Sequence, residues 1–198
     1  DQPGQVHRMP PRRRGQNVQV MIVQPRQQSC MSFAEQADVH GESLGGLKHP
    51  GEEGAWEFTH LWHKLRPWPD SVEGIGMMKK KYVVATLSNG NVALLINMAK
   101  NGGIPWDHCF SGETFHHYKP DPEAYLGVVD SMYLKPHQVM LCAAHNGDLA
   151  AAQKCGLSTG YINRPYEHGP NQKVDFKATG DWDVVGDTII ELAKKIGC

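Results

Sequence analysis

Three polar clusters in the sequence have residue types that could do chemistry together. They are Ser88-Asn89, Lys119 and His145-Asn146-Gly147-Asp148. Hydroxyl and amide groups can donate hydrogen bonds to a small anion, and a lysine ammonium can bind an anion or neutralise a buried carboxylate. Taken singly, each cluster also fits a local role, as turn residues, a surface lysine or a helix N-cap. Their chemistry therefore depends on whether the fold brings them together.

The sequence around Lys119 restricts the position of that side chain. Asp121 can cap a helix and Pro122 fits the first helical turn, so the backbone next to Lys119 is fixed by a helix start. A positioned ammonium suits an anion or a buried carboxylate. Tyr125 lies in the same first turn, where its hydroxyl could reach the same cleft or its ring could pack against a sheet.

The segments that would position these clusters alternate between strand and helix. Strands are predicted over residues 82–87, 139–143 and 157–162, and helices over 92–102, 121–132, 148–155 and 184–196. Continuous apolar, β-branched runs such as YVVATL are typical of parallel strands buried on both faces. The alternation predicts an α/β fold with a parallel sheet and flanking helices, in which functional groups gather at the carboxyl ends of the strands.

The composition divides the chain into two regions. Residues 1–55 are rich in Gly, Pro, Gln and Arg, and their strand-like run is 18–23 (VQVMIV). We therefore predict an irregular or atypical N-terminal segment over residues 1–55 that packs poorly, and one packed core over 56–198.

The length, net charge and cysteine content of the chain limit the classes of partner that it can have. The chain has 198 residues and a net charge of -1, so it has no general electrostatic attraction to nucleic acid or anionic membranes. Its five cysteines show no metal-ligand spacing, which is typical of reduced intracellular thiols. No run reaches the about 18 apolar residues of a membrane span. We expect a cytoplasmic protein with no nucleic-acid or membrane partner.

Four segments, in order and spacing, resemble the L-2-haloacid dehalogenases of the haloacid dehalogenase superfamily. They are residues 65–74 (LRPWPDSVEG), 87–91 (LSNGN), 117–125 (HYKPDPEAY) and 140–149 (MLCAAHNGDL). Four ordered segments make a chance match improbable. The resemblance covers about residues 58–198 and implies the Rossmann-like core of that superfamily.

The resemblance also implies roles for the polar clusters. Ser88 and Asn89 would hold the carboxylate of the substrate, and Lys119 would neutralise crowded carboxylates. Asp148 would support the lysine and the hydrolytic water. His145 falls where many members have asparagine, and both a pocket role and a structural role stay open. The candidates are Lys119, Asp148 and Asp38 for catalysis, and Ser88, Asn89, Tyr125 and His145 for substrate binding.

The nucleophile is the part of the family pattern that is missing. The family reaction begins with attack of an aspartate on C2 of the substrate, and this aspartate should follow the first strand. At the end of the strand-like run 18–23, the position expected for this aspartate is occupied by Val23 or Gln24. Neither side chain can form an ester. Asp38 keeps a D-x-x-G spacing and is the nucleophile candidate. Too few residues would then remain for a full cap domain, so we expect the cap to be truncated or absent.

The sequence predicts a hydrolase that releases halide from 2-haloalkanoic acids through an aspartyl ester, impaired by the missing motif. No metal or other cofactor is expected, and the expected partner is a small carboxylate substrate, with a homodimer left open. One alternative is a magnesium-dependent phosphatase of small metabolites, although paired Asp-x-Asp acids are missing from the first motif. Another is a catalytically silent protein of the same fold that binds small anions or serves in interactions. Turnover stays open, and we expect 2-chloropropionate to bind weakly and to release little or no halide.

Overall fold

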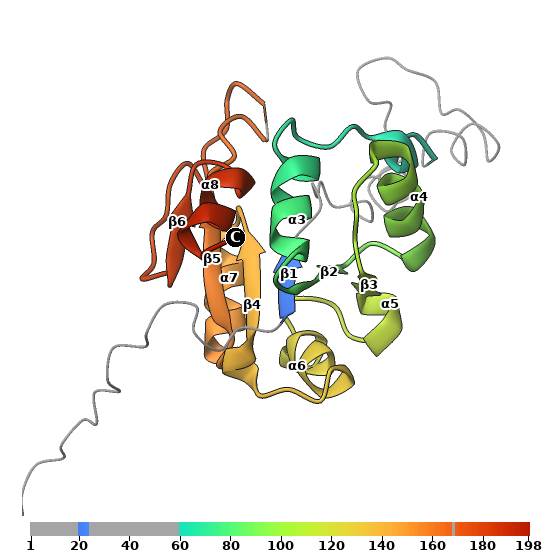
Figure 1. Cartoon of the computed structure of the whole chain (residues 1–198), viewed down its shortest axis with the longest axis vertical. Helices are drawn as coiled ribbons and strands as arrows, with labels where there is room; N and C mark the ends of the chain where they lie inside the picture. Colours follow the sequence, from blue (N-terminus) through green and yellow to red (C-terminus); the bar gives the residue numbers. More distant parts are fainter. Residues whose placement is uncertain (1–19, 24–59, 168) are drawn as a thin grey trace, which may run out of the picture.

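The fold is a six-stranded parallel sheet with helices on both faces (Figure 1). The structure is a computed structural model that describes residues 20–23, 60–167 and 169–198. The strand order is β3-β2-β1-β4-β5-β6, and each neighbouring pair is parallel. The strands are β1 (Val20–Val23), β2 (Val83–Ser88), β3 (His108–Ser111), β4 (Val139–Ala143), β5 (Ser158–Ile162) and β6 (Val184–Gly186). The predicted α/β fold is confirmed.

The helices divide between the two faces because successive strand residues point to opposite sides. Ile22 and Leu141 pack in one apolar cluster with residues of α6 and α7, whereas Met21 and Met140 pack in a second cluster with residues of α3 and α8. The helices are α3 (Ser71–Lys79), α4 (Val92–Gly102), α5 (Gly112–Phe115), α6 (Pro122–Ser131), α7 (Asn146–Lys154) and α8 (Ile189–Lys195), and the 3-10 turns are η2 (Trp62–Lys64) and η3 (Pro136–Gln138).

The first strand lies in the middle of the sheet. β1 pairs with β2 on one side and with β4 on the other, and each of its four residues is at most 1% exposed. The expected strand in residues 18–23 is confirmed for Val20–Val23. For these four residues the prediction of poor packing is wrong, because an apolar run can fill both faces of a central parallel strand. The rest of residues 1–55, and with them the expected cap, lie outside the described residues.

The C-terminal region differs from the predicted single helix over residues 184–196. Val184 and Val185 belong to β6, which pairs with β5, and the helix α8 begins only at Ile189. The Thr188 side chain caps α8 by accepting a hydrogen bond from the backbone N–H of Glu191. The prediction was wrong because the two β-branched residues before Gly186 favour a strand at the edge of the sheet. Their apolar side chains also fit the helical period of the residues that follow, so the sequence did not separate the strand from the helix.

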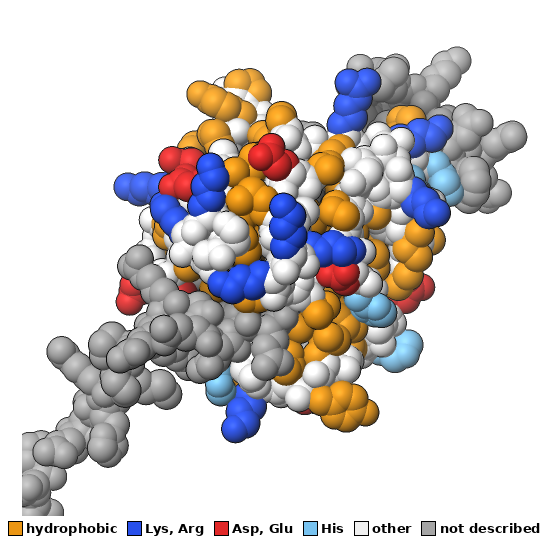
Figure 2. All heavy atoms as spheres, viewed as in Figure 1, with side chains coloured by type: hydrophobic (Ala, Val, Ile, Leu, Met, Phe, Trp, Pro, Cys, Tyr) orange, Lys and Arg blue, Asp and Glu red, His pale blue; other side chains and the backbone are white. Residues whose placement is uncertain are grey.

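The surface mixes charges and apolar groups. Figure 2 shows Lys and Arg side chains over the middle of one face, with Asp, Glu and apolar side chains around them. Lysines occur in the last turns of α3 and α8, where a cation stabilises the helix dipole. Among the described residues, no helix is long and apolar enough to cross a membrane.

Candidate functional site

The central contact of the site joins two of the predicted clusters. The Nζ of Lys119 lies 2.9 Å from Oδ2 of Asp148, and the two side chains are 6% and 12% exposed. Lys119 lies just before α6, and Asp148 lies in the first turn of α7, directly after β4. Parallel strands place such connections at one edge of the sheet. The predicted contact between Lys119 and Asp148 is therefore present.

The second carboxylate oxygen of Asp148 also has a partner. Tyr125, which is fully buried in the first turns of α6, donates its hydroxyl hydrogen to Oδ1 of Asp148 at 2.5 Å. Burial, followed by the nearby charge of Asp148, raises the pKa of the Tyr125 hydroxyl. Tyr125 therefore remains a neutral donor, and Asp148 is held between a phenol and an ammonium.

The charge of Lys119 is subject to two opposing effects. Burial lowers the pKa of the Lys119 ammonium, whereas the charge of Asp148 and the hydrogen bond to it favour the protonated form. An ammonium in this position can attract an anion only while it stays protonated.

Asn89 fixes the backbone of Lys119 from the end of β2. Its Nδ2 donates to the carbonyl of Lys119 at 3.0 Å, and its Oδ1 accepts from the N–H of Lys119 at 2.8 Å. Ser88, the last residue of β2, accepts a hydrogen bond from the N–H of Gly90 through its Oγ at 2.9 Å. The structure thus brings the β2 cluster to Lys119, with the Asn89 amide holding the lysine backbone. The substrate contacts of Ser88 and Asn89 stay predictions.

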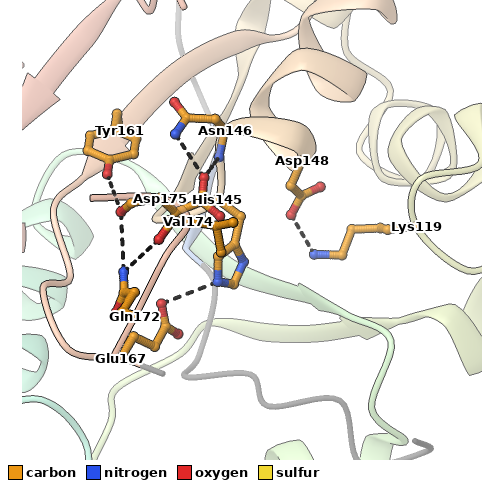
Figure 3. A network of polar contacts seen from close by, with 9 residues as sticks. All are labelled: Lys119, His145, Asn146, Asp148, Tyr161, Glu167, Gln172, Val174 and Asp175. Carbon is orange, nitrogen blue, oxygen red and sulfur yellow. Dashed lines mark hydrogen bonds and ion pairs between the residues drawn. The ribbon is translucent and has the colours of Figure 1, made fainter. Parts of the chain in front are cut away.

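His145 contacts a residue that sequence reasoning did not identify. Its Nε2 lies 3.2 Å from Oε2 of Glu167, a carboxylate that is only 5% exposed (Figure 3). The contact with Glu167 raises the pKa of His145, burial opposes this, and the charges of Glu167, Asp175 and Asp148 add to the increase. The pair therefore favours an imidazolium next to the Lys119–Asp148 contact.

The loop between β5 and β6 is attached to the start of α7 by further hydrogen bonds. The backbone N–H and the Nδ2 of Asn146 donate to Oδ1 of Asp175 at 2.9 and 2.8 Å. The Asn146 Oδ1 accepts from Trp182 Nε1, and Tyr161 donates its hydroxyl hydrogen to the Asp175 carbonyl. Glu167 and Asp175 lie in a non-periodic loop, so no pattern in the sequence could indicate them. Asn146 alone belonged to a predicted cluster.

A small pocket opens beside His145, on the side of the sheet that α3 and α8 cover. Its volume is about 40 Å³, enough for a few water molecules. Trp68, Trp106 and Ile75 supply apolar wall, and Arg66, Arg164, His145 and Glu167 supply charge. The lining of this pocket is therefore partly apolar and partly charged.

A buried ion pair holds one wall of the pocket. Nη2 of Arg164 lies 3.0 Å from both oxygens of Asp70, and Asp70 also accepts from the N–H of Ile189 at 2.7 Å. The guanidinium lies 4.9 Å from the centroid of the Trp68 ring. These contacts link the end of β5 to the beginnings of α3 and α8, so Arg164 is a structural group of the wall.

The described end of β1 carries no reactive side chain. Val23 is its last residue and is fully buried next to Cys142 of β4, its partner in the sheet. Burial raises the pKa of the Cys142 thiol well above its usual value, so this cysteine is a poor nucleophile. Asp38 lies outside the described residues. In residues 20–23, 60–167 and 169–198, no group of three or more His, Cys, Asp or Glu side chains could hold a metal ion.

Comparison with known proteins identifies relatives over most of the chain. No protein-family model matches it. The solved structure of the defluorinating L-2-haloacid dehalogenase Rha0230 is 34% identical with a TM-score of 0.77, and the match covers 93% of this chain and 97% of the other. The L-2-haloacid dehalogenase PA0810 is 42% identical with a TM-score of 0.75, over 84% of this chain and 69% of the other.

A curated relative gives the same relationship over a shorter stretch. The (S)-2-haloacid dehalogenase 1 of Pseudomonas sp. strain CBS-3 is 32% identical over 106 residues, which are 52% of this chain and 47% of the relative. The (S)-2-haloacid dehalogenase of Xanthobacter autotrophicus is 25% identical and is covered over 49% of its length. The chain thus matches about half the length of its curated relatives.

Proposed function

Because the chain belongs to the family of L-2-haloacid dehalogenases, we propose that it hydrolyses small 2-haloalkanoic acids and releases halide. The names of its relatives support this substrate class. The observation that carries the proposal is the contact of Lys119 with Asp148, together with the two hydrogen bonds between the Asn89 side chain and the Lys119 backbone. This arrangement offers a fixed positive charge at the carboxyl edge of the sheet.

In the proposed reaction, the polar groups of β2 and of the segment before α6 bind the substrate. Donors at Ser88 and Asn89 and the ammonium of Lys119 hold the carboxylate, which fixes C2 of the substrate. A carboxylate nucleophile attacks C2, the carbon–halogen bond breaks, and the halide leaves with the bonding electrons. Water then attacks the ester carbonyl, which restores the carboxylate and releases the 2-hydroxy acid. Asp148 supports Lys119 and the water in this second step.

The nucleophile in this proposal is Asp38. Val23 cannot form an ester, and burial makes the thiol of Cys142, its partner in the sheet, a poor nucleophile. The proposed reaction therefore takes its nucleophile from another part of the chain. Asp38 is the residue whose D-x-x-G spacing supports it.

The proposed reaction needs no metal ion. Both oxygens of Asp148 accept hydrogen bonds from the chain itself, one from Lys119 and one from Tyr125. A magnesium site of the phosphatase kind would need carboxylate oxygens directed at the ion. The pairing of both Asp148 oxygens with Lys119 and Tyr125 argues against the phosphatase alternative.

The second candidate function is binding of small carboxylates without turnover. The apolar end of β1 favours it, because Lys119 and the β2 donors can bind an anion even where no nucleophile is in place.

Halide release from (S)-2-chloropropionate separates the two functions. If Asp38 is the nucleophile, the hydrolase should release chloride at about 1 per second or faster, in place of the little or no release expected from the missing first motif alone. Lys119→Ala should then reduce this rate strongly, while the exposed Lys100→Ala does not. Binding that needs Lys119 but yields no chloride would support the second function. Chloride release unaffected by Lys119→Ala would contradict both, since neither would then use the site.

A further inference from the structure

His145 and Glu167 form a contact between two segments that are distant in the sequence. His145 directly precedes α7, and Glu167 lies in the loop after β5. In the view of Figure 3 the imidazole lies between Glu167 and the Lys119–Asp148 pair. Both His145 and Glu167 line the small pocket. The dyad therefore lies where the pocket meets the carboxyl edge of the sheet.

The carboxylate of Glu167 is costly to bury unless it is paired. It is 5% exposed, and its Oε2 lies 3.2 Å from the Nε2 of His145. An unpaired buried carboxylate would lose the free energy of hydration, which a charged hydrogen-bond donor restores. The loop that carries Glu167 is also fixed, because Asp175 binds Asn146 at the start of α7. Glu167 is thus held within ion-pair distance of the imidazole.

We propose that Glu167 is a positioning residue that keeps His145 charged and facing the pocket, so that this imidazolium adds to Lys119 in binding the carboxylate of a 2-haloacid. The inference rests on the proposed function, because it assigns a second cationic group to the same anion site. An asparagine at this position has a neutral amide and could not supply this charge. Affinity for an anion should therefore follow the protonation of His145.

The charged groups around His145 set the direction of that dependence. Glu167, Asp175 and Asp148 favour the imidazolium, and burial opposes it, with a raised pKa of His145 as the result. Arg66 and Arg164 also line the pocket, but Arg164 is held by Asp70. The ammonium of Lys119 is held by Asp148. Anion affinity should be highest below the pKa of His145 and should fall as the pH rises through it.

The test measures the dissociation constant of (S)-2-chloropropionate between about pH 5.5 and 8.5, where this acid stays ionised and histidine titrates. Fluorescence of Trp68 and Trp106, which line the pocket, reports binding. The variants are Glu167→Gln, which keeps the shape of the side chain, and His145→Asn. Glu73→Gln, an exposed position on α3, is the matched control. The His145 ring titration is followed by NMR in the absence of ligand.

We expect the wild-type affinity to fall about tenfold across this range, as for the loss of one nearby charge. Glu167→Gln should lower the pKa of His145 and move the midpoint of the affinity curve to lower pH, and His145→Asn should give a flat profile. Equal profiles for the wild type and Glu167→Gln, with binding intact, would overturn this inference alone. Absence of binding by the wild type at every pH would overturn the proposed function and this inference with it.

Discussion

The carboxyl end of β1 differs from the carboxyl ends of its neighbours β2 and β4 in the type of side chain that it presents. The ends of β2 and β4 lead into Asn89 and Asp148, and both residues contact Lys119, which lies between α5 and α6. β1 lies between these strands and ends in buried Val23. The contacts of the proposed anion site thus lie in the described residues, whereas the four described residues of the strand expected to carry the nucleophile are apolar and buried.

The difference shows that the fold and the reaction place separate demands on β1. The sheet needs only apolar side chains on both faces of a central strand, and Met21 and Ile22 meet this need from opposite sides. The reaction needs a carboxylate at the same edge. A sequence can satisfy the first demand in β1 and supply the second from another segment.

The largest effect on stability is expected at the polar side. Lys119→Ala leaves the buried carboxylate of Asp148 without its cation, which should lower the free energy of unfolding by about 3–5 kcal/mol. Urea unfolding measures the change, and the exposed Lys100→Ala should alter it by less than about 0.5 kcal/mol. A Lys119→Ala protein as stable as the wild type would mean that Lys119 and Asp148 do not form a buried pair.

The contribution of β1 is tested by removing one of its core side chains. Ile22 is fully buried between β2 and β4, so Ile22→Ala should cost about 2–5 kcal/mol through lost burial and the cavity that remains. Ile96 of α4 is 44% exposed and is the control, with an expected cost below about 1 kcal/mol. Equal costs at the two positions would contradict the central place of β1 in the sheet.

A smaller effect should follow from the hydroxyl of Tyr125. Tyr125→Phe removes one donor to the Asp148 carboxylate and should cost about 1.5–3 kcal/mol in urea unfolding. Tyr133 is 97% exposed, and Tyr133→Phe should have almost no effect. A neutral Tyr125→Phe result would show that Lys119 alone satisfies Asp148.

The smallest predicted effect is a pH dependence of stability. The folded state raises the pKa of His145 above the about 6.5 of an unfolded histidine, so its stabilising contribution is complete below that pH and is lost as the pH rises through the folded value. His145→Asn should therefore lose more stability near pH 5.5 than near pH 9, by about 1 kcal/mol. The exposed His137→Asn should lose equal amounts at both. A pH-independent loss in His145→Asn would contradict the charged pair with Glu167.

The sequence predicted the core of the fold and the principal contact of the site. Apolar runs indicated strands β1, β2, β4 and β5 and helices α4, α6 and α7, and the topology of a parallel sheet then brought Lys119 and Asp148 to one edge. The resemblance indicated the roles of these residues. Both inferences depended on patterns that repeat over several residues.

Other features have no such pattern. β3 is a strand of four residues, too short for a clear period, and Val184–Gly186 was included in the helix that follows it. The contact of His145 with Glu167 joins segments 22 positions apart in the numbering through an irregular loop, so only the folded chain reveals it. Long-range pairs of this kind depend on tertiary packing.

The most direct test of the account is to identify the residue that forms the ester. The protein is incubated with (S)-2-chloropropionate, quenched with acid within one turnover and digested, and the peptides are mapped by mass spectrometry. The account predicts a propionate group on the peptide that contains Asp38, lost in Asp38→Asn, whereas the exposed Asp130→Asn keeps it. A propionate ester on any other residue, or rapid chloride release by Asp38→Asn, would contradict it.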